Sequence, residues 1–284
     1  MRQTTLLTLC VVGTVGLAAC EKPDAEVETA MEAVNAIDDT NLSALMLTNS
    51  SPEEGVSYFQ RASSEKPDRI DLKRGLAISL VRAGETKRAV STWNDVLKME
   101  GANSDDKVAL ADAQIRDGDW DAAAATLNTV PPTYETFRRY RLEAMVADSN
   151  QEWRKADSFY EVALGLTTQP SGVLNNWGYS KLSRGDYPAA ERLFTQALTY
   201  DPSMFTAKNN IALARGAQRN YTLPVIDMTQ VERAQLLHTL GLAAVKQGDV
   251  TIGQGLLKEA VDSHPQYFEA AVRSLRALEN NVTN

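Results

Sequence analysis

The chain has 284 residues, with 29 basic and 37 acidic side chains and a formal net charge of −8 at pH 7. This length allows one or two domains with a sizeable core. The acidity argues against general nucleic-acid binding, because contacts to phosphates need a basic surface. After the first twenty residues the sequence contains no cysteine and no run of 18 apolar residues. That part of the sequence therefore predicts neither a disulfide framework nor a membrane-spanning helix.

The N-terminus has the features of a bacterial export signal. Arg2 precedes the apolar stretch Leu6–Leu17, which is too short to span a membrane. The stretch ends in Leu-Ala-Ala-Cys at Leu17–Cys20, which resembles the lipobox of bacterial lipoproteins. The resemblance implies cleavage before Cys20 and lipidation of Cys20, with stable membrane attachment through two or more acyl chains. Glu21 at the next position implies the periplasmic face of the outer membrane of a Gram-negative bacterium. A plain secretory leader or a signal anchor is the alternative interpretation.

Residues 171–203 form the clearest of several similar segments. Trp177 and Phe194 are large side chains suited to fill the space between two helices, and the other three tryptophans are also expected in the core. Gly178 permits a close helix approach, Gly185 suits a turn with positive φ, and Pro202 ends a second helix. The pattern resembles the tetratricopeptide repeat, a helix–turn–helix unit of 34 residues. One unit cannot bury its own apolar face, so neighbouring units are expected.

Steps of about 34 residues from this segment locate further units. The predicted starts are Ala36, Ile70, Ser104, Phe137, Ser171, Phe205 and Ala234. The unit from Phe205 loses its second helix, because Asn220–Gln230 contains Pro224 and has no helical period. An amphipathic segment from Phe268 to Leu278 provides the terminal cap that a solenoid needs.

The predicted fold is all-α: a right-handed α-solenoid of about seven tetratricopeptide repeats with a C-terminal capping helix. We expect a signal peptide at 1–19, the lipidated cysteine and an acidic tether at 20–35, and the repeat array at 36–217. An irregular linker at 218–233 and a C-terminal repeat with its cap at 234–284 complete the chain. The linker either redirects the superhelix or separates the array from a C-terminal lobe.

No motif for catalysis or metal binding is present. His238 and His264 lack metal-ligand spacing. The acid pairs Asp38–Asp39, Glu53–Glu54 and Asp105–Asp106 fall at predicted helix starts, where carboxylates stabilise the helix dipole. We therefore predict a protein that is not an enzyme and has no catalytic residue, metal site, cofactor or small-molecule substrate.

The predicted site is a groove for a protein partner. In stacked repeats of this family the first helix of each unit lines the concave face, and Asn175, Asn176, Asn209 and Asn210 map to that face in two adjacent units. Amide side chains both donate to and accept from a peptide backbone, so two such pairs in register suit an extended segment. The alternative is that asparagine occurs there for reasons internal to the repeat.

Basic side chains also map to the groove in an otherwise acidic chain. They are Arg74, Arg82, Arg116, Arg138 and Arg141. Guanidinium groups on an inner face favour an acidic or carboxylate-bearing partner. The alternative is that these arginines pair with neighbouring carboxylates such as Asp71, Asp105 or Asp112.

The C-terminal half carries a more specific resemblance. Leu174–Gly178, Lys208–Ala214, Val231–Leu237 and Ala244–Val250, together with the lipobox, resemble the TadD-like lipoproteins of tight adherence (Flp pilus) secretion systems. The resemblance implies a non-enzymatic assembly factor at the outer membrane whose partner is a pilus secretin or another secretion component. Other roles stay open: an adaptor for outer-membrane β-barrel assembly, an adaptor that recruits cell-wall hydrolases, and an enzyme with an unrecognised site.

Overall fold

A computed structural model describes residues 42–282, with side chains up to Glu279. The leader, Cys20, Asp38–Asp39 and the whole tether lie outside the described residues. Residues 42–48 form a helical segment, and the remaining regular structure of the described range is helical, without a strand. The helices are α2 (Pro52–Glu65), α3 (Ile70–Arg82), α4 (Thr86–Val96), α5 (Ser104–Asp117), α6 (Trp120–Asn128), α7 (Phe137–Ser149), α8 (Trp153–Gly165), α9 (Ser171–Ser183), α10 (Tyr187–Tyr200), α11 (Phe205–Ala217), α12 (Gln230–Lys246), α13 (Val250–Ser263) and α14 (Glu269–Val282).

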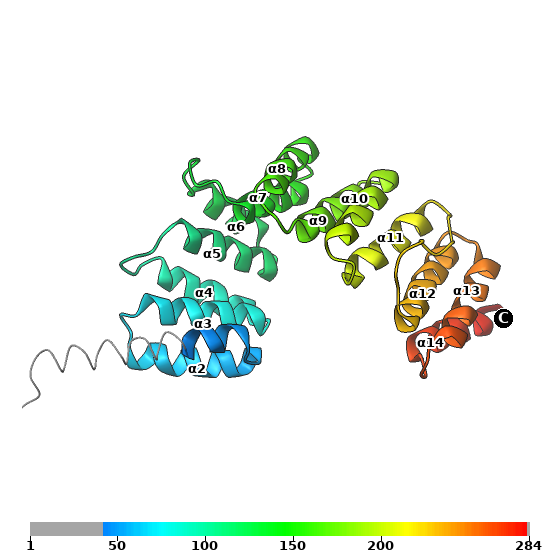
Figure 1. Ribbon diagram of the computed structural model, residues 1–284, viewed down its shortest axis with the longest axis horizontal. Helices are drawn as coiled ribbons and strands as arrows, with labels where there is room; N and C mark the ends of the chain where they lie inside the picture. Colours follow the sequence, from blue (N-terminus) through cyan, green and yellow to red (C-terminus); the bar gives the residue numbers. More distant parts are fainter. Residues whose placement is uncertain (1–41, 283–284) are drawn as a thin grey trace, which may run out of the picture.

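The helices pair with their neighbours in sequence and form an arch, with α2 and α14 at its ends and α7 and α8 near its crown (Figure 1). The first helices α3, α5, α7, α9 and α11 begin at the five residues from Ile70 to Phe205 where the 34-residue steps place units. This agreement confirms the predicted all-helical solenoid of tetratricopeptide repeats. No helix in residues 42–282 is long and apolar enough to cross a membrane.

The turn inside each pair repeats one hydrogen-bonding pattern. In the pair α9–α10, Gly185 has φ of +82° and the Asp186 N–H donates to the Lys181 carbonyl oxygen at 2.9 Å. This is the long bond of a Schellman motif, which satisfies carbonyl groups at the end of the first helix. Gln151 (φ 58°) and Arg219 (φ 59°) occupy the same place in the units that lack the glycine. The turn geometry therefore persists where the sequence signal for it is lost.

Large side chains of one helix pack on small residues of the next. Phe194 of α10 is fully buried, and a Cβ added to Gly178 of α9 would lie 2.6 Å from its ring. The expectation that all four tryptophans are core residues holds fully for Trp93, which is buried. Trp120 and Trp177 are partly buried and pack against the core, and Trp153 is partly buried. The indole N–H of Trp177 donates to Asp157 at 2.6 Å, because an indole needs a polar partner.

The irregular segment between α11 and α12 is shorter than predicted and is packed. It covers residues 218–229 instead of 218–233, because Thr229 and Glu232 form a capping box that starts α12 at Gln230. Leu223 and Ile226 pack against the cores on either side. The segment therefore replaces a second helix with a packed loop.

Two further contacts tie this loop down, and α14 closes the array. Arg219 forms an ion pair with Asp249 at 3.0 Å, and the Tyr221 hydroxyl donates to the same carboxylate at 2.5 Å.

At the C-terminal end, Phe268 and Ala271 pack against the helix pair α12–α13 through Leu237 of α12 and Ala260 of α13. The cap thus covers the apolar face that the last repeat would otherwise expose.

The left-handed residue in the α7–α8 turn gives a test of this fold. Gln151→Gly should raise the free energy of unfolding by roughly 0.5–1 kcal/mol, because glycine removes the strain of a left-handed non-glycine residue. The midpoint of urea unfolding measures the change. The control is Gly185→Ala, where no atom lies within 4 Å of the added Cβ, so backbone strain alone should lower the midpoint. A lower midpoint for Gln151→Gly would contradict the assigned turn.

Candidate functional site

A pocket of about 420 Å³ opens between the first helices of three successive repeats. Met145 of α7 and Tyr179 of α9 contribute apolar and aromatic surface, and Thr206 contributes from α11. Trp120, at the start of α6, and Tyr160 of α8 also line the pocket. Tyr179 is 58 % exposed, so a large aromatic ring is accessible beside the pocket. This combination of apolar surface and polar side chains is typical of ligand sites.

The predicted asparagines lie at this pocket and beyond it, but they are linked to one another. The Asn210 amide donates to the Asn175 side-chain oxygen at 3.2 Å. One repeat further on, the Thr239 hydroxyl donates to the Asn209 side-chain oxygen at 2.7 Å. Asn175, Asn176 and Asn210 line the pocket, whereas Asn209 does not. Polar side chains of successive first helices therefore form hydrogen bonds across the groove.

These bonds change what individual asparagines can do. Asn210 is only 6 % exposed, so its amide positions the Asn175 side chain and offers little surface to a ligand. Asn176 is half-buried, and its amide lies 3.5 Å from the Met145 sulfur, a weak acceptor. Asn175 and Asn176 are therefore the two candidates that remain available to a partner.

Two of the five predicted groove arginines hold the fold together. Both Nε and Nη2 of Arg74 donate to the buried Asp106 carboxylate at 2.7 Å, which joins α3 to α5. Asp106 also completes the capping box of α5, as Glu54 does for α2, so these acids cap helices as expected. Arg82 donates to the carbonyl oxygens of Leu47 and Ser50 and so satisfies groups in the last turn of the helical segment 42–48 and just after it.

The other three arginines surround one carboxylate. Arg116 and Arg138 approach Asp112 at 3.4 and 3.1 Å. Arg141 lies near them, and its Nε is buried without a hydrogen-bond partner in the described part of the chain. Burial lowers the pKa of Arg141, Asp112 opposes this shift, and Arg138 and Arg116 add to it. Three guanidinium groups thus lie near one carboxylate that pairs with two of them, which leaves an excess of positive charge between α5 and α7.

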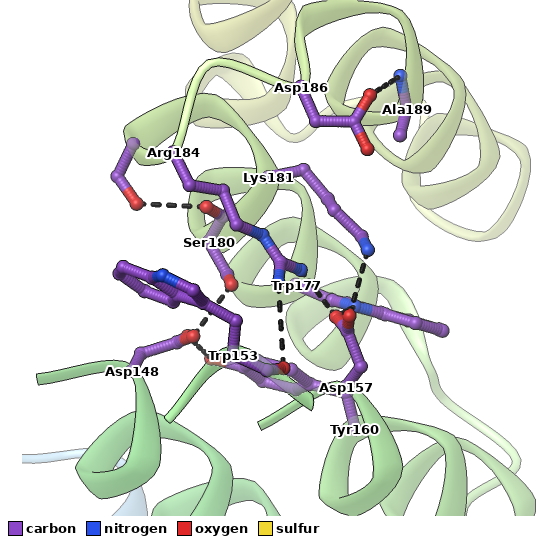
Figure 2. A network of polar contacts seen from close by, with 11 residues as sticks. Asp148, Trp153, Asp157, Tyr160, Trp177, Ser180, Lys181, Arg184, Asp186 and Ala189 are labelled. Atoms are coloured by element: carbon purple, nitrogen blue, oxygen red, sulfur yellow. Dashed lines mark hydrogen bonds and ion pairs between the residues drawn. The ribbon is translucent and has the colours of Figure 1, made fainter. Parts of the chain in front are cut away.

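Asp148 introduces the opposite charge at the pocket. Its two carboxylate oxygens accept hydrogen bonds from the Tyr160 hydroxyl at 2.9 Å and the Ser180 hydroxyl at 2.7 Å (Figure 2). Burial raises the pKa of Asp148, and these two hydrogen bonds offset only part of that effect. Neutral donors therefore fix the position of the carboxylate without neutralising its charge.

Asp157, on the neighbouring helix, is surrounded differently. Its carboxylate accepts from Arg184, from Lys181 at 3.0 Å and from the Trp177 indole (Figure 2). Burial alone would raise its pKa, but the hydrogen bonds from Arg184, Trp177 and Lys181 outweigh burial and lower it. The cations between α8 and α9 thus form their ion pairs with Asp157, and in the described residues Asp148 is bonded only by neutral donors.

Sequence reasoning missed Asp148, although a signal for it exists. The unit-to-unit steps that align the repeats place it in a row otherwise occupied by uncharged residues, which are Leu47, Val81, Ile115, Leu182, Gly216 and Val245. A carboxylate at this place departs from the apolar pattern of the packed face. Comparing each repeat position across units, rather than searching for catalytic motifs, would have identified it.

A second missed feature is an exposed apolar row on the first helices. The same steps align Tyr179 with Ala44, Ile78, Met145, Leu213 and Leu242, all apolar, and with Asp112 in the unit from Ser104. Ile78, Leu213 and Leu242 are each more than a third exposed, and Met145 shares the pocket with Tyr179. Repetition at one helical position places these side chains along the same face of the array. The groove is therefore more apolar than the predicted asparagines and arginines imply.

The histidines have structural contacts. His238 Nε2 lies 3.1 Å from the Ser274 hydroxyl of α14, and burial lowers the His238 pKa. His264 stacks on Phe268 with ring centroids 5.0 Å apart. Between residues 42 and 279, no three His, Cys, Asp or Glu side chains gather in a way that could hold a metal ion.

Comparisons with known proteins agree with the helical repeat. A tetratricopeptide repeat model matches residues 74–135 and 175–223. Among curated proteins, none matches this chain.

Solved structures with similar folds include other proteins built of these repeats. A tetratricopeptide repeat protein from Parabacteroides merdae superposes with a TM-score of 0.56 at 15 % identity, covering 84 % of this chain and 96 % of that one. PilW, a type IV pilus biogenesis factor, gives 0.55 at 15 % identity, with 72 % and 98 % covered. The Cut9–Hcn1 structure of the APC/C gives 0.59 at 14 % identity, and this chain spans 48 % of the matched one. At these identities the likeness shows the fold.

The environment of Asp148 predicts a pH-dependent stability. Because burial raises its folded-state pKa, the ionised carboxylate disfavours folding above that pKa, and the penalty disappears as the pH falls below the unfolded pKa. Asp148→Asn should therefore raise the thermal midpoint at pH 7, and the gain should vanish in acid. Arg184 and Asp157 are the nearby charges that act on it, and both remain in the variant. Thermal unfolding followed by circular dichroism at several pH values measures this; a loss of stability at pH 7 would contradict it.

Proposed function

Because the chain folds as a solenoid of tetratricopeptide repeats, we propose that it is a non-enzymatic scaffold that binds a protein segment in the groove of its first helices. The pocket between α7, α9 and α11 is the observation that carries this proposal. It combines the exposed ring of Tyr179 with the amides of Asn175 and Asn176. Apolar side chains supply contact area, and amides satisfy the backbone of an extended segment.

The proposed setting is the periplasmic face of the outer membrane, where the scaffold serves tight-adherence (Flp) pilus biogenesis. The lipobox ending at Cys20 supports membrane attachment through lipid. The TadD-like segments support the pilus system and a secretin, or another secretion component, as partner. PilW, whose fold is similar, is a pilus biogenesis factor, which is consistent with this use of the architecture.

Site-specific photocrosslinking tests the groove. p-Benzoylphenylalanine in place of Tyr179 should crosslink a secretion component in living cells, because this side chain is exposed beside the pocket. Tyr200 is the matched control, since it is 57 % exposed but lies at the end of α10, a second helix. The partner is identified by mass spectrometry of the crosslinked product. Crosslinking at Tyr200 alone would refute the groove, and a β-barrel assembly protein or a cell-wall hydrolase at Tyr179 would refute the pilus role.

The lipid anchor has a separate test. Cys20→Ser should abolish incorporation of labelled palmitate and release the protein from the membrane fraction, because serine cannot form the thioether to lipid. Labelling of immunoprecipitated protein and fractionation measure both effects. Continued labelling of the variant would rule out Cys20 as the lipidated residue.

A further inference from the structure

Asp148 is the one charged residue among those that line the α7–α9–α11 pocket of the described chain. The other lining residues are amides, hydroxyls, a thioether and aromatic rings. An ionised carboxylate attracts a cation most strongly when water and competing charges are few. The electrostatic character of this pocket is therefore set by one negative charge.

The hydrogen bonds around Asp148 hold it ready for a cation. Tyr160 and Ser180 each donate to one oxygen, and neither carries a positive charge (Figure 2). Cations do lie between α8 and α9, but these two, Lys181 and Arg184, both bind Asp157 (Figure 2). The chain thus neutralises one half-buried carboxylate with its own side chains and leaves the adjacent one for another source of positive charge.

The neutral side chains of the pocket wall also favour a bound cation. Trp120 and Tyr179 contribute aromatic rings, and ring faces attract ammonium and guanidinium groups. Asn175 and Asn176 lie in the same pocket, and amide oxygens accept from such groups. These neutral groups stabilise a cation without repelling it.

We propose that this pocket binds a lysine or arginine side chain of the partner segment, with Asp148 as its counter-ion. The proposal rests on the groove function above and specifies the chemistry that the groove recognises. A carboxylate that weakens folding while it is ionised is the kind of residue expected at a binding site, where function opposes stability.

The arginine cluster gives the bound segment a direction. Arg141 precedes Asp148 by seven residues on α7, which places the two about 10 Å apart along the helix axis. Positive charge around Arg141 repels a cationic side chain and attracts a carboxylate, whereas Asp148 does the reverse. A segment with a basic and an acidic residue therefore fits the groove in one orientation.

A titration with a minimal probe tests the pocket directly. The mature chain carrying Cys20→Ser is titrated with Nα-acetyl-lysine N-methylamide while NMR follows the Trp120 indole and the side-chain amides of Asn175 and Asn176. The uncharged analogue Nα-acetyl-norleucine N-methylamide controls for the aliphatic chain. Saturable shifts are expected with the lysine probe, and the norleucine probe should bind at least about tenfold more weakly because it lacks the charge.

Variants separate the proposed counter-ion from general charge. Asp148→Asn retains groups that can hydrogen-bond Tyr160 and Ser180, so it should fold while losing about tenfold in affinity for the lysine probe. Asp95→Asn removes the same charge from an exposed carboxylate of α4 that pairs with Lys98 and does not line the pocket, and should leave that affinity unchanged. Equal losses in both variants, or equal binding of the two probes, would overturn the proposal.

The exposed aromatic ring provides a third variant that does not disturb the core. Tyr179→Ala should lower the affinity for the lysine probe several-fold, because a ring beside the pocket is lost.

Failure of the lysine site is distinguishable from failure of the groove. A chain that ignores the probe but still crosslinks at position 179 keeps its groove and loses only the cation site. A chain that crosslinks nothing there loses the proposed function.

Discussion

Close packing of each helix pair is the contact on which the array depends. Phe194 fills the space that Gly178 leaves, so two helices approach more closely than a side chain at that position would allow. A pair built in this way still exposes an apolar face, and only the next pair covers it. The Schellman turn then fixes the direction in which the second helix returns. The same contacts, repeated, turn a row of helices into a groove with side chains at regular spacing.

Most of the fold could be predicted from this repetition. Gly185 identified the turn, and a step of 34 residues located the first helices to the residue. The prediction was poorer where the period fails, since the start of α12 depends on a cap at Thr229 rather than on the repeat. The site was predicted less well. Asn175 and Asn176 line the pocket, but Arg74 proved structural because its partner, the buried carboxylate of Asp106, lies 32 residues away.

The charged groups of the inner face show how one set of residue types serves two purposes. Arg74 donates two hydrogen bonds to the carboxylate of Asp106. This paired contact holds two helices together and leaves few free hydrogen-bonding groups for a ligand. Arg141 and Asp148 are incompletely matched, with a buried guanidinium nitrogen on one and only neutral donors on the other. Incomplete matching in a folded chain destabilises it, and a partner of complementary charge removes that penalty. Partners are therefore selected by charge pattern as well as by shape.

The loop at 218–229 determines how the C-terminal helices unfold relative to the rest. In a linear array each unit is stabilised by its neighbours, so a missing helix would divide the molecule into two independently melting blocks. Here Arg219 and Tyr221 both bind Asp249, across the gap in the repeat, and Leu223 packs into the adjoining cores. These contacts restore the coupling that the lost helix would have supplied. Amide hydrogens on the two sides of the loop are therefore expected to exchange with solvent through a shared opening rather than through separate ones.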